Sequence, residues 1–179
     1  MLAASLILVG CSSPQSTESP SGQAAEISVA PAAGEIIAGS GYSYSVPEGW
    51  AIPAGLTLQG VDTFAGDLTD DDGFVDNVNV VLSPRGLLTA DEVESAGVAE
   101  LEAVGGLDVT VRDRVIVTGS ESAHLSALLT SDGSRYYVEQ YYLSDVSQSF
   151  VVTFSYSTGV AASDRESLAE SVLASWSWE

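Results

Sequence analysis

The spacing of apolar and polar residues along the chain predicts a domain built on a β-sheet. Tyr42, Tyr44 and Val46 alternate with serines, which is the pattern of a half-buried strand. The segment Trp50–Phe64 is less regular and suggests a second strand. In Phe74–Leu82, apolar side chains occupy both odd and even positions, as in a central strand covered on both faces. We therefore expect layers on both sides of the sheet.

Four more strands are expected in the second half of the chain. Each is a run of alternating apolar residues, over residues 109–117, 123–129, 136–143 and 150–156. Gly119 separates the first two runs, and Asp132 with Gly133 supplies turn chemistry before the third. Short connections of this kind predict an antiparallel meander.

Two helices are expected from their first turns. Thr89 with Glu92 matches a capping box, and Ser163 with Glu166 repeats it. The apolar helix positions recur every three to four residues or at multiples of that spacing: Val93, Leu101 and Val104 with Gly97 in the first, and Leu168, Val172 and Trp176 in the second. The element order predicts an α+β fold, an antiparallel sheet with helices packed on it.

The amino terminus carries a pattern of its own. The apolar run Leu2–Val9 is shorter than the roughly 20 residues that cross a bilayer, and it ends at Cys11 in a sequence that resembles a lipobox. We predict a lipoprotein signal segment over residues 1–11 with a lipid on the Cys11 thiol. A buried structural cysteine is the alternative, but no core-forming residues surround Cys11. No Lys or Arg precedes the run, so we expect the true start to lie upstream.

Residues 12–40 are rich in Ser, Pro, Gly, Ala and Gln and predict a flexible tether, followed by one domain over residues 41–179. A lipid on Cys11 would make the cell membrane a partner of the chain. The expected location is therefore extracytoplasmic and lipid-anchored to the cell membrane.

Charge and cysteine content narrow the possible functions. The 25 acidic residues face five arginines and no lysine, so the net charge of −20 argues against nucleic acid as a partner. Absence of lysine beside abundant Ala, Gly and Val resembles proteins of high-GC actinobacteria, and the acidity alone would also suit a halophile. Because Cys11 is the only cysteine, neither an intramolecular disulfide nor a cysteine metal cluster can form.

Several short motifs, in order, resemble the PsbP-like superfamily. They are the strand leading into Pro47-Glu48-Gly49-Trp50, the segment 76–81, the capped helix, the stretches 119–125 and 150–155, and the end Ser175-Trp176-Ser177-Trp178. LpqN-type lipoproteins of actinobacteria are similar in layout, with such a domain behind a lipobox and a polar tether. The resemblance covers roughly residues 41–178. It implies an α/β/α sandwich with non-catalytic accessory or protein-binding roles and no shared catalytic residues or cofactor.

Two groups of side chains are candidates for a site. His124 is the only histidine and the only base for a Ser-His-Asp triad, but no Gly-x-Ser-x-Gly elbow exists and we expect a surface histidine. Tyr137 and Tyr141 share a strand face with Glu139, and this face is the candidate interface. Ordinary core packing is the alternative reading of these tyrosines.

The acidic loop is the one candidate metal site, and its candidate ligands are Asp70, Asp72 and Asp76. When its glycine is aligned with an EF-hand loop, the first and twelfth positions become Leu68 and Asn79, so the motif fails at both ends. We expect a solvated loop rather than a calcium site.

The sequence thus predicts a cell-envelope lipoprotein with a non-enzymatic binding or accessory domain for an unknown envelope protein or ligand. The alternative is a carrier of a lipid or small apolar ligand in a cavity between sheet and helix. A hydrolase is the remote alternative.

Overall fold

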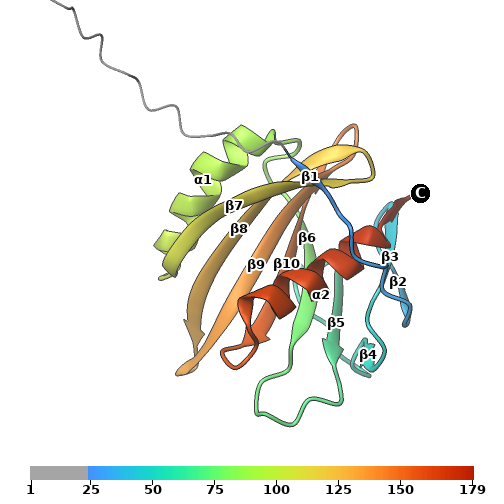
Figure 1. The fold of residues 1–179 in the computed structure, drawn as a ribbon, viewed down its shortest axis with the longest axis vertical. Coiled ribbons are helices and arrows are strands. Elements are labelled where there is room, and N and C mark those ends of the chain that lie inside the picture. The colour runs from blue at the N-terminus through green and yellow to red at the C-terminus, as the bar shows by residue number, and fades with distance from the viewer. Residues whose placement is uncertain (1–23) are drawn as a thin grey trace, which may run out of the picture.

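The computed structural model describes residues 24–179, which form eleven strands and two helices (Figure 1). The strands are β1 (Ala25–Glu26), β2 (Ile36–Ala38), β3 (Tyr42–Ser45), β4 (Trp50–Ala51), β5 (Thr63–Asp67), β6 (Asn77–Leu82), β7 (Leu107–Val117), β8 (Ser120–Ser131), β9 (Ser134–Ser144), β10 (Ser149–Ser157) and β11 (Ser177–Trp178). The helices are α1 (Ala90–Ala103) and α2 (Ala162–Ala174).

Among the described residues every strand pair but one is antiparallel, as the sequence predicts for the sheet. Eight strands form one sheet in the order β1-β7-β8-β9-β10-β6-β5-β4, and β11-β3-β2 form a second, smaller sheet. Strand β1 runs parallel to β7, whereas the other pairs are antiparallel. The sheet is therefore mixed, and the predicted meander is confirmed as β7-β8-β9-β10.

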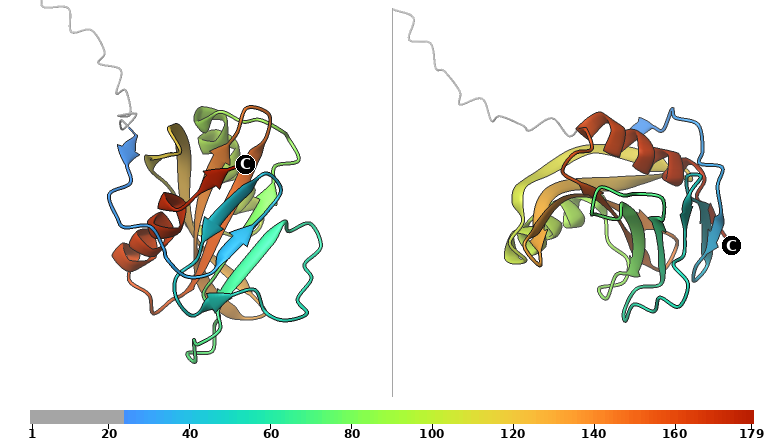
Figure 2. Two further views of the ribbon diagram at one scale, coloured as in Figure 1. Left: turned by 90° about the vertical axis from the view of Figure 1, so that its right-hand side faces the viewer. Right: turned by 90° about the horizontal axis from the view of Figure 1, so that it is seen from below.

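The two helices lie on opposite faces of the large sheet (Figures 1 and 2). Neighbouring residues of a strand point to opposite faces, so each central strand contributes to two cores. Tyr141 belongs to the core on the α2 side and Tyr142 to the core on the α1 side. The predicted coverage of both faces is confirmed, and the layers form an α/β/α sandwich.

Helix α1 begins with the predicted capping box. The Glu92 carboxylate accepts a hydrogen bond from the Thr89 backbone N–H at 2.8 Å, and the Thr89 hydroxyl accepts one from the Glu92 N–H at 3.3 Å. The helix approaches the sheet closely at Gly97, where an added Cβ would lie 2.5 Å from Leu125 Cδ1. The prediction that Val104 lies on the buried stripe of this helix is wrong. Val104 follows the last helical residue and is 71% exposed.

Helix α2 lacks the predicted capping box. Its N-cap is Ala161, which has no side-chain hydrogen bond, and the Ser163 hydroxyl donates to Asp164 instead. Ser163 is already inside the helix, so it cannot cap the helix start. Burial of Val172 and Leu173 against the sheet holds this helix in place.

The folded domain begins before the predicted boundary at residue 41. Strand β2 pairs with β3, and Ile37 is only 1% exposed. The Ala32 N–H donates to the carbonyl of Ser171 in α2 at 2.8 Å. At least residues 24–40 therefore belong to the domain rather than to the tether. Residues 1–23, including Cys11, lie outside the described residues.

The second predicted strand is shifted along the chain. Strand β5 begins at Thr63, and the preceding residues 52–62 form a loop that leaves Leu56 and Leu58 about two-fifths exposed, at 40% and 39%. The next strand, β6, begins at Asn77 rather than Phe74. Among residues 24–179, no helix combines the length and apolar character needed to cross a membrane.

Candidate functional site

A buried cluster of charged residues lies between the sheet and α2. The Glu139 carboxylate on β9 accepts a hydrogen bond from Arg165 Nε of α2 at 3.0 Å and pairs with His124 Nε2 of β8 at 3.0 Å. The exposed fractions are 1% for His124, 4% for Glu139 and 7% for Arg165. Because a lone buried charge is costly, these three groups stabilise one another in place.

Aromatic rings enclose this cluster. The Tyr141 ring stacks on His124 with 4.0 Å between ring centroids, and the Arg165 guanidinium lies 3.9 Å from the centre of the Tyr137 ring. Burial alone would raise the pKa of Glu139, but the hydrogen bonds and charges of His124 and Arg165 outweigh it and hold that pKa below its ordinary value. Glu139 is therefore ionised at neutral pH.

The cluster overturns two predictions made from the sequence. His124 is not a surface histidine, because it lies beneath α2 and is bonded to Glu139. Tyr141 and Glu139 do not form an exposed interface, since both point into the core, and Tyr137 is half-buried against Arg165. Core packing, the alternative reading, describes this face correctly.

Within the acidic loop, Asp70 and Asp72 accept hydrogen bonds from the loop's own backbone. Asp70 accepts a hydrogen bond from the Asp72 N–H at 3.1 Å, and Asp72 accepts one from Phe74 at 2.9 Å. Asp76 is 9% exposed and accepts a hydrogen bond from the Ser157 N–H at 2.7 Å. Burial, with the nearby loop carboxylates, raises the pKa of Asp76 to about 6. Within residues 24–179, no group of three or more His, Cys, Asp or Glu side chains is arranged to hold a metal ion.

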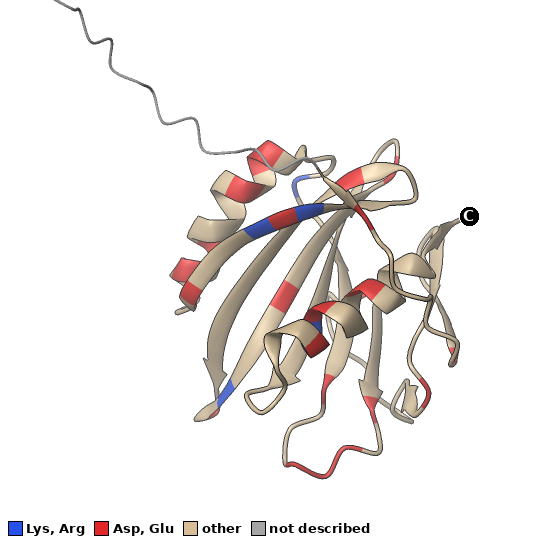
Figure 3. Ribbon diagram, viewed as in Figure 1, with Lys and Arg blue, Asp and Glu red and all other residues tan. Residues whose placement is uncertain are grey.

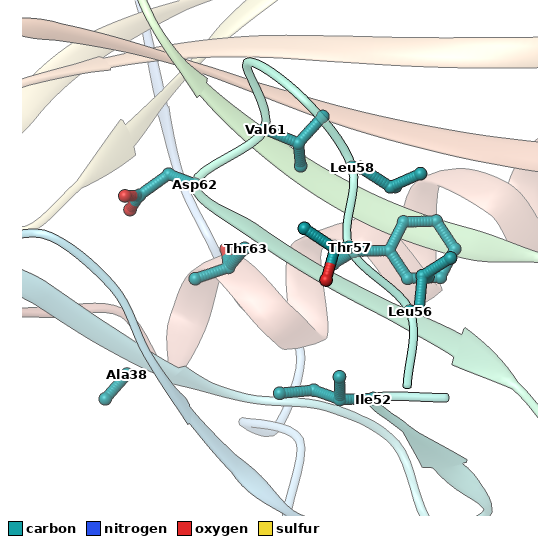
Figure 4. A pocket seen from close by; sticks show the side chains of 9 residues that line it. Ala38, Ile52, Leu56, Thr57, Leu58, Val61, Asp62 and Thr63 are labelled. Atoms are coloured by element: carbon teal, nitrogen blue, oxygen red, sulfur yellow. The ribbon is translucent and has the colours of Figure 1, made fainter. Parts of the chain in front are cut away.

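A pocket that the sequence pattern did not predict lies beside β5. It has a volume of about 240 Å³ and is lined by Ala38, Ile52, Leu56, Thr57, Leu58, Val61, Asp62, Thr63 and Phe64 (Figure 4). Most of its wall comes from the loop over residues 52–62. The available signal was a run of apolar residues interrupted by the turn residues Pro53, Gly55 and Gly60.

Asp62 supplies the charged end of this pocket. Its carboxylate accepts hydrogen bonds from the Ser40 N–H at 2.8 Å, the Ser40 hydroxyl at 2.6 Å and the Tyr42 hydroxyl at 2.7 Å. Partial burial by itself would raise the pKa of Asp62, but these hydrogen bonds outweigh it and lower the pKa below its ordinary value. Asp62 is thus a fixed carboxylate that is ionised at neutral pH.

Two other hollows differ in size and lining. One of about 470 Å³ lies between residues 26–31, the end of β7 and the carboxyl end of α2, and Trp176 lines it. The indole Nε1 of Trp176 is buried and has no hydrogen-bond partner among residues 24–179. A second hollow, of about 70 Å³, lies between α1 and the sheet near Gly97 and Tyr142. The latter is smaller than the few hundred Å³ typical of ligand pockets.

The architecture matches known proteins at the level of the fold. A mixed sheet with one helix on each face is the PsbP-like fold, and solved structures that share it align over most of this chain. The cyanobacterial PsbP (CyanoP) of Synechocystis sp. PCC 6803 is 18% identical, with a TM-score of 0.51 over 93% of this chain and 100% of its own. LpqN of Mycobacterium tuberculosis, a protein involved in cell envelope biogenesis, is 13% identical, with a TM-score of 0.51 over 78% of this chain and 84% of its own.

A third structure, from Bacteroides thetaiotaomicron, is 13% identical with a TM-score of 0.51 over 82% of this chain. The alignment spans 48% of that longer protein, or about half its length. At the sequence level, no family model and no curated protein matches the chain. The comparisons therefore establish the PsbP-like fold.

Proposed function

We propose that this chain is a cell-envelope lipoprotein whose PsbP-like domain is a non-enzymatic binding or accessory module. The observation that carries the proposal is the fold shared with LpqN, a protein of cell envelope biogenesis, together with the lipobox-like sequence that ends at Cys11. The cyanobacterial PsbP shares this architecture, and because a fold by itself implies no function, the proposal rests on the site and on the likeness to LpqN.

The position of His124 supports a non-enzymatic role over the hydrolase alternative. A general base must reach the proton that it removes. The Nε2 atom of His124 is hydrogen-bonded to Glu139, and the Tyr141 ring stacks on the imidazole ring. Only 1% of His124 is exposed. Such a histidine serves the packing of α2 on the sheet and offers no surface to a substrate.

The anchoring part of the proposal is tested by Cys11→Ser, expressed from the natural start in the native host. We expect wild-type protein in the membrane fraction and a mass increase from diacylglycerol on Cys11, whereas Cys11→Ser remains an unmodified precursor. An unmodified Cys11 in mature wild-type protein would refute the anchor.

The accessory part is tested by deleting the gene and measuring envelope permeability to a detergent and a fluorescent dye. We expect greater permeability, restored by the wild-type gene and not by Cys11→Ser. A deletion strain with unchanged permeability, or full rescue by the unanchored variant, would contradict an anchored envelope role.

A carrier of a small apolar ligand is the second candidate, and the hollow beside Trp176 favours it. Its volume of about 470 Å³ lies within the range of ligand pockets, and apolar side chains of Ile27, Pro31 and Trp176 form part of its lining. Titration with a fatty acid, followed by tryptophan fluorescence, should then saturate at one equivalent. An unchanged emission spectrum would dismiss the carrier.

A further inference from the structure

The pocket beside β5 is lined by exposed apolar side chains, although the protein as a whole is strongly acidic. Ile52, Leu56 and Leu58 are 50%, 40% and 39% exposed and line a hollow of about 240 Å³. Ile36, on the same outward face of β2 as the lining residue Ala38, is 70% exposed. Exposed apolar side chains scattered singly need no explanation, but a group around one hollow marks a surface where something binds.

The other end of the pocket is negative. In Figure 4 the Asp62 carboxylate lies at the opposite end of the pocket from Leu56 and Leu58. Within the described residues, Asp62 forms no ion pair. In the view of Figure 3, acidic positions are spread over helices, strands and loops, whereas basic positions are few. The chain carries a net charge of −20, so a cation approaching Asp62 meets an attractive field.

The carboxylate is also held in position. Ser40 and Tyr42 together donate three hydrogen bonds to it, and the Tyr42 ring is fully buried and stacks on Trp176 with 4.4 Å between centroids. Because Asp62 is fixed to the core, a cation that binds it loses little free energy to ordering the acceptor.

We propose that this pocket receives an arginine or lysine side chain of a partner protein, with the aliphatic stem against Ile52, Leu56 and Leu58 and the cationic head on Asp62. The proposal rests on the binding role proposed above and names the chemistry of the partner. Arginine and lysine are the side chains that combine a long apolar stem with a cationic head.

The position of the pocket favours a protein over the membrane as its occupant. In both views of Figure 2, the loop leading into β5 lies on the opposite side of the domain from β1, where the described chain begins. Anionic lipid headgroups would also be repelled by the acidic surface. A basic partner protein meets neither obstacle.

The test is an NMR titration of the full chain with acetyl-arginine amide and, in parallel, with acetyl-norleucine amide, which has an aliphatic stem but no charge. We expect saturable amide shifts confined to residues 52–64 and the neighbouring residues 38–42 with the arginine probe. Affinity for the norleucine probe should be about tenfold lower, which is the effect of one charge-assisted hydrogen bond.

Variants separate the two ends of the pocket. Asp62→Asn should weaken the arginine probe about tenfold, whereas Glu102→Gln, which removes an exposed charge on α1, should leave its affinity unchanged. Leu58→Ser should weaken both probes, and Val146→Ser, at a side chain that is 98% exposed, serves as its control. Amide dispersion verifies that each variant is folded. If Asp62→Asn does not fold, Leu58→Ser still tests the pocket.

Two outcomes would overturn the assignment. Equal binding of the two probes would make the pocket a site for neutral apolar ligands, and arginine shifts that persist unchanged in both Asp62→Asn and Leu58→Ser would place the cation elsewhere. A failure here with the permeability phenotype intact would remove only this pocket assignment. A missing phenotype with probe binding intact would remove the envelope role instead.

Discussion

Replacing Arg165 with Met would test whether the buried charge cluster holds α2 on the sheet. Methionine retains much of the aliphatic stem but loses the bond to Glu139 at 3.0 Å, the bond to the Val160 carbonyl at 2.9 Å and the contact with the Tyr137 ring at 3.9 Å. Removing one partner of a buried ion pair costs about 3–5 kcal/mol. Because His124 remains beside Glu139, we expect the lower end, about 3 kcal/mol.

The assay is urea unfolding at pH 7, followed by tryptophan fluorescence. Arg112→Met is the matched control, since Arg112 pairs with Glu166 at 3.4 Å but both side chains are about two-fifths exposed, at 41% and 40%. That exposed pair should contribute less than about 1 kcal/mol. The double variant Glu139→Gln with Arg165→Met should be more stable than the sum of the single effects, because no unpaired carboxylate then stays buried.

The pH dependence gives the prediction a second readout. The folded-state pKa of Glu139 lies below its ordinary value of 4.5, so its stabilising contribution is present above about pH 4.5 and is lost as pH falls through the lower folded value. Arg165→Met removes the part of this contribution that Arg165 supplies, whereas His124, the larger of the two causes, remains, so the difference in stability from the wild type should shrink in acid. Equal destabilisation by Arg165→Met and Arg112→Met at pH 7, or a difference that does not shrink in acid, would refute the reasoning.

Four further substitutions test the structure elsewhere. Burial raises the pKa of Asp76 to about 6, so the contribution of Asp76 to stability should fall as pH rises from about 4 to 6, and Asp76→Asn should add about 1–3 kcal/mol at pH 7 but little at pH 3.5 in urea unfolding. Gly97→Ala should lower the free energy of unfolding by about 1–3 kcal/mol, despite the better helix propensity of alanine, because its Cβ would meet Leu125; an unchanged melting temperature would argue against this close contact. Thr89→Ala should cost about 1 kcal/mol and Ser163→Ala less than about 0.5 kcal/mol, and equal losses would contradict the different caps of the two helices.

Long strands were predictable from the sequence because they carry many repeats of the two-residue period. Strands β7 to β10 have nine to twelve residues each and appear where alternation predicts them. Strands β1 and β2 have two and three residues, too few for a period to show, and they lie in a segment rich in small and polar residues. Tertiary contacts, above all the burial of Ile37, decide their structure.

The same four-residue pattern gave one correct helix cap and one incorrect one. A capping box needs an extended residue before the helix as well as the two side chains. Thr89 has this conformation, with φ −80° and ψ 158°, whereas Ser163 is already inside α2 and the extended residue is Ala161. Residue types alone do not specify the backbone conformation, so the motif marks a helix start only to within a turn.

The position of His124 depends on the pairing register of β8 and β9, which the period of the sequence alone does not give. The expectation of a surface histidine placed this polar position toward solvent, although layers were expected on both sides of the sheet and both faces are covered. The turn at Asp132 and Gly133 fixes the pairing of β8 with β9, which places His124 opposite Tyr141 and one step diagonally from Glu139. A histidine and a glutamate on a covered face must find partners, because neither can be desolvated alone. With the central strands expected to be covered, that register could have predicted a buried pair and a third charge from the covering helix.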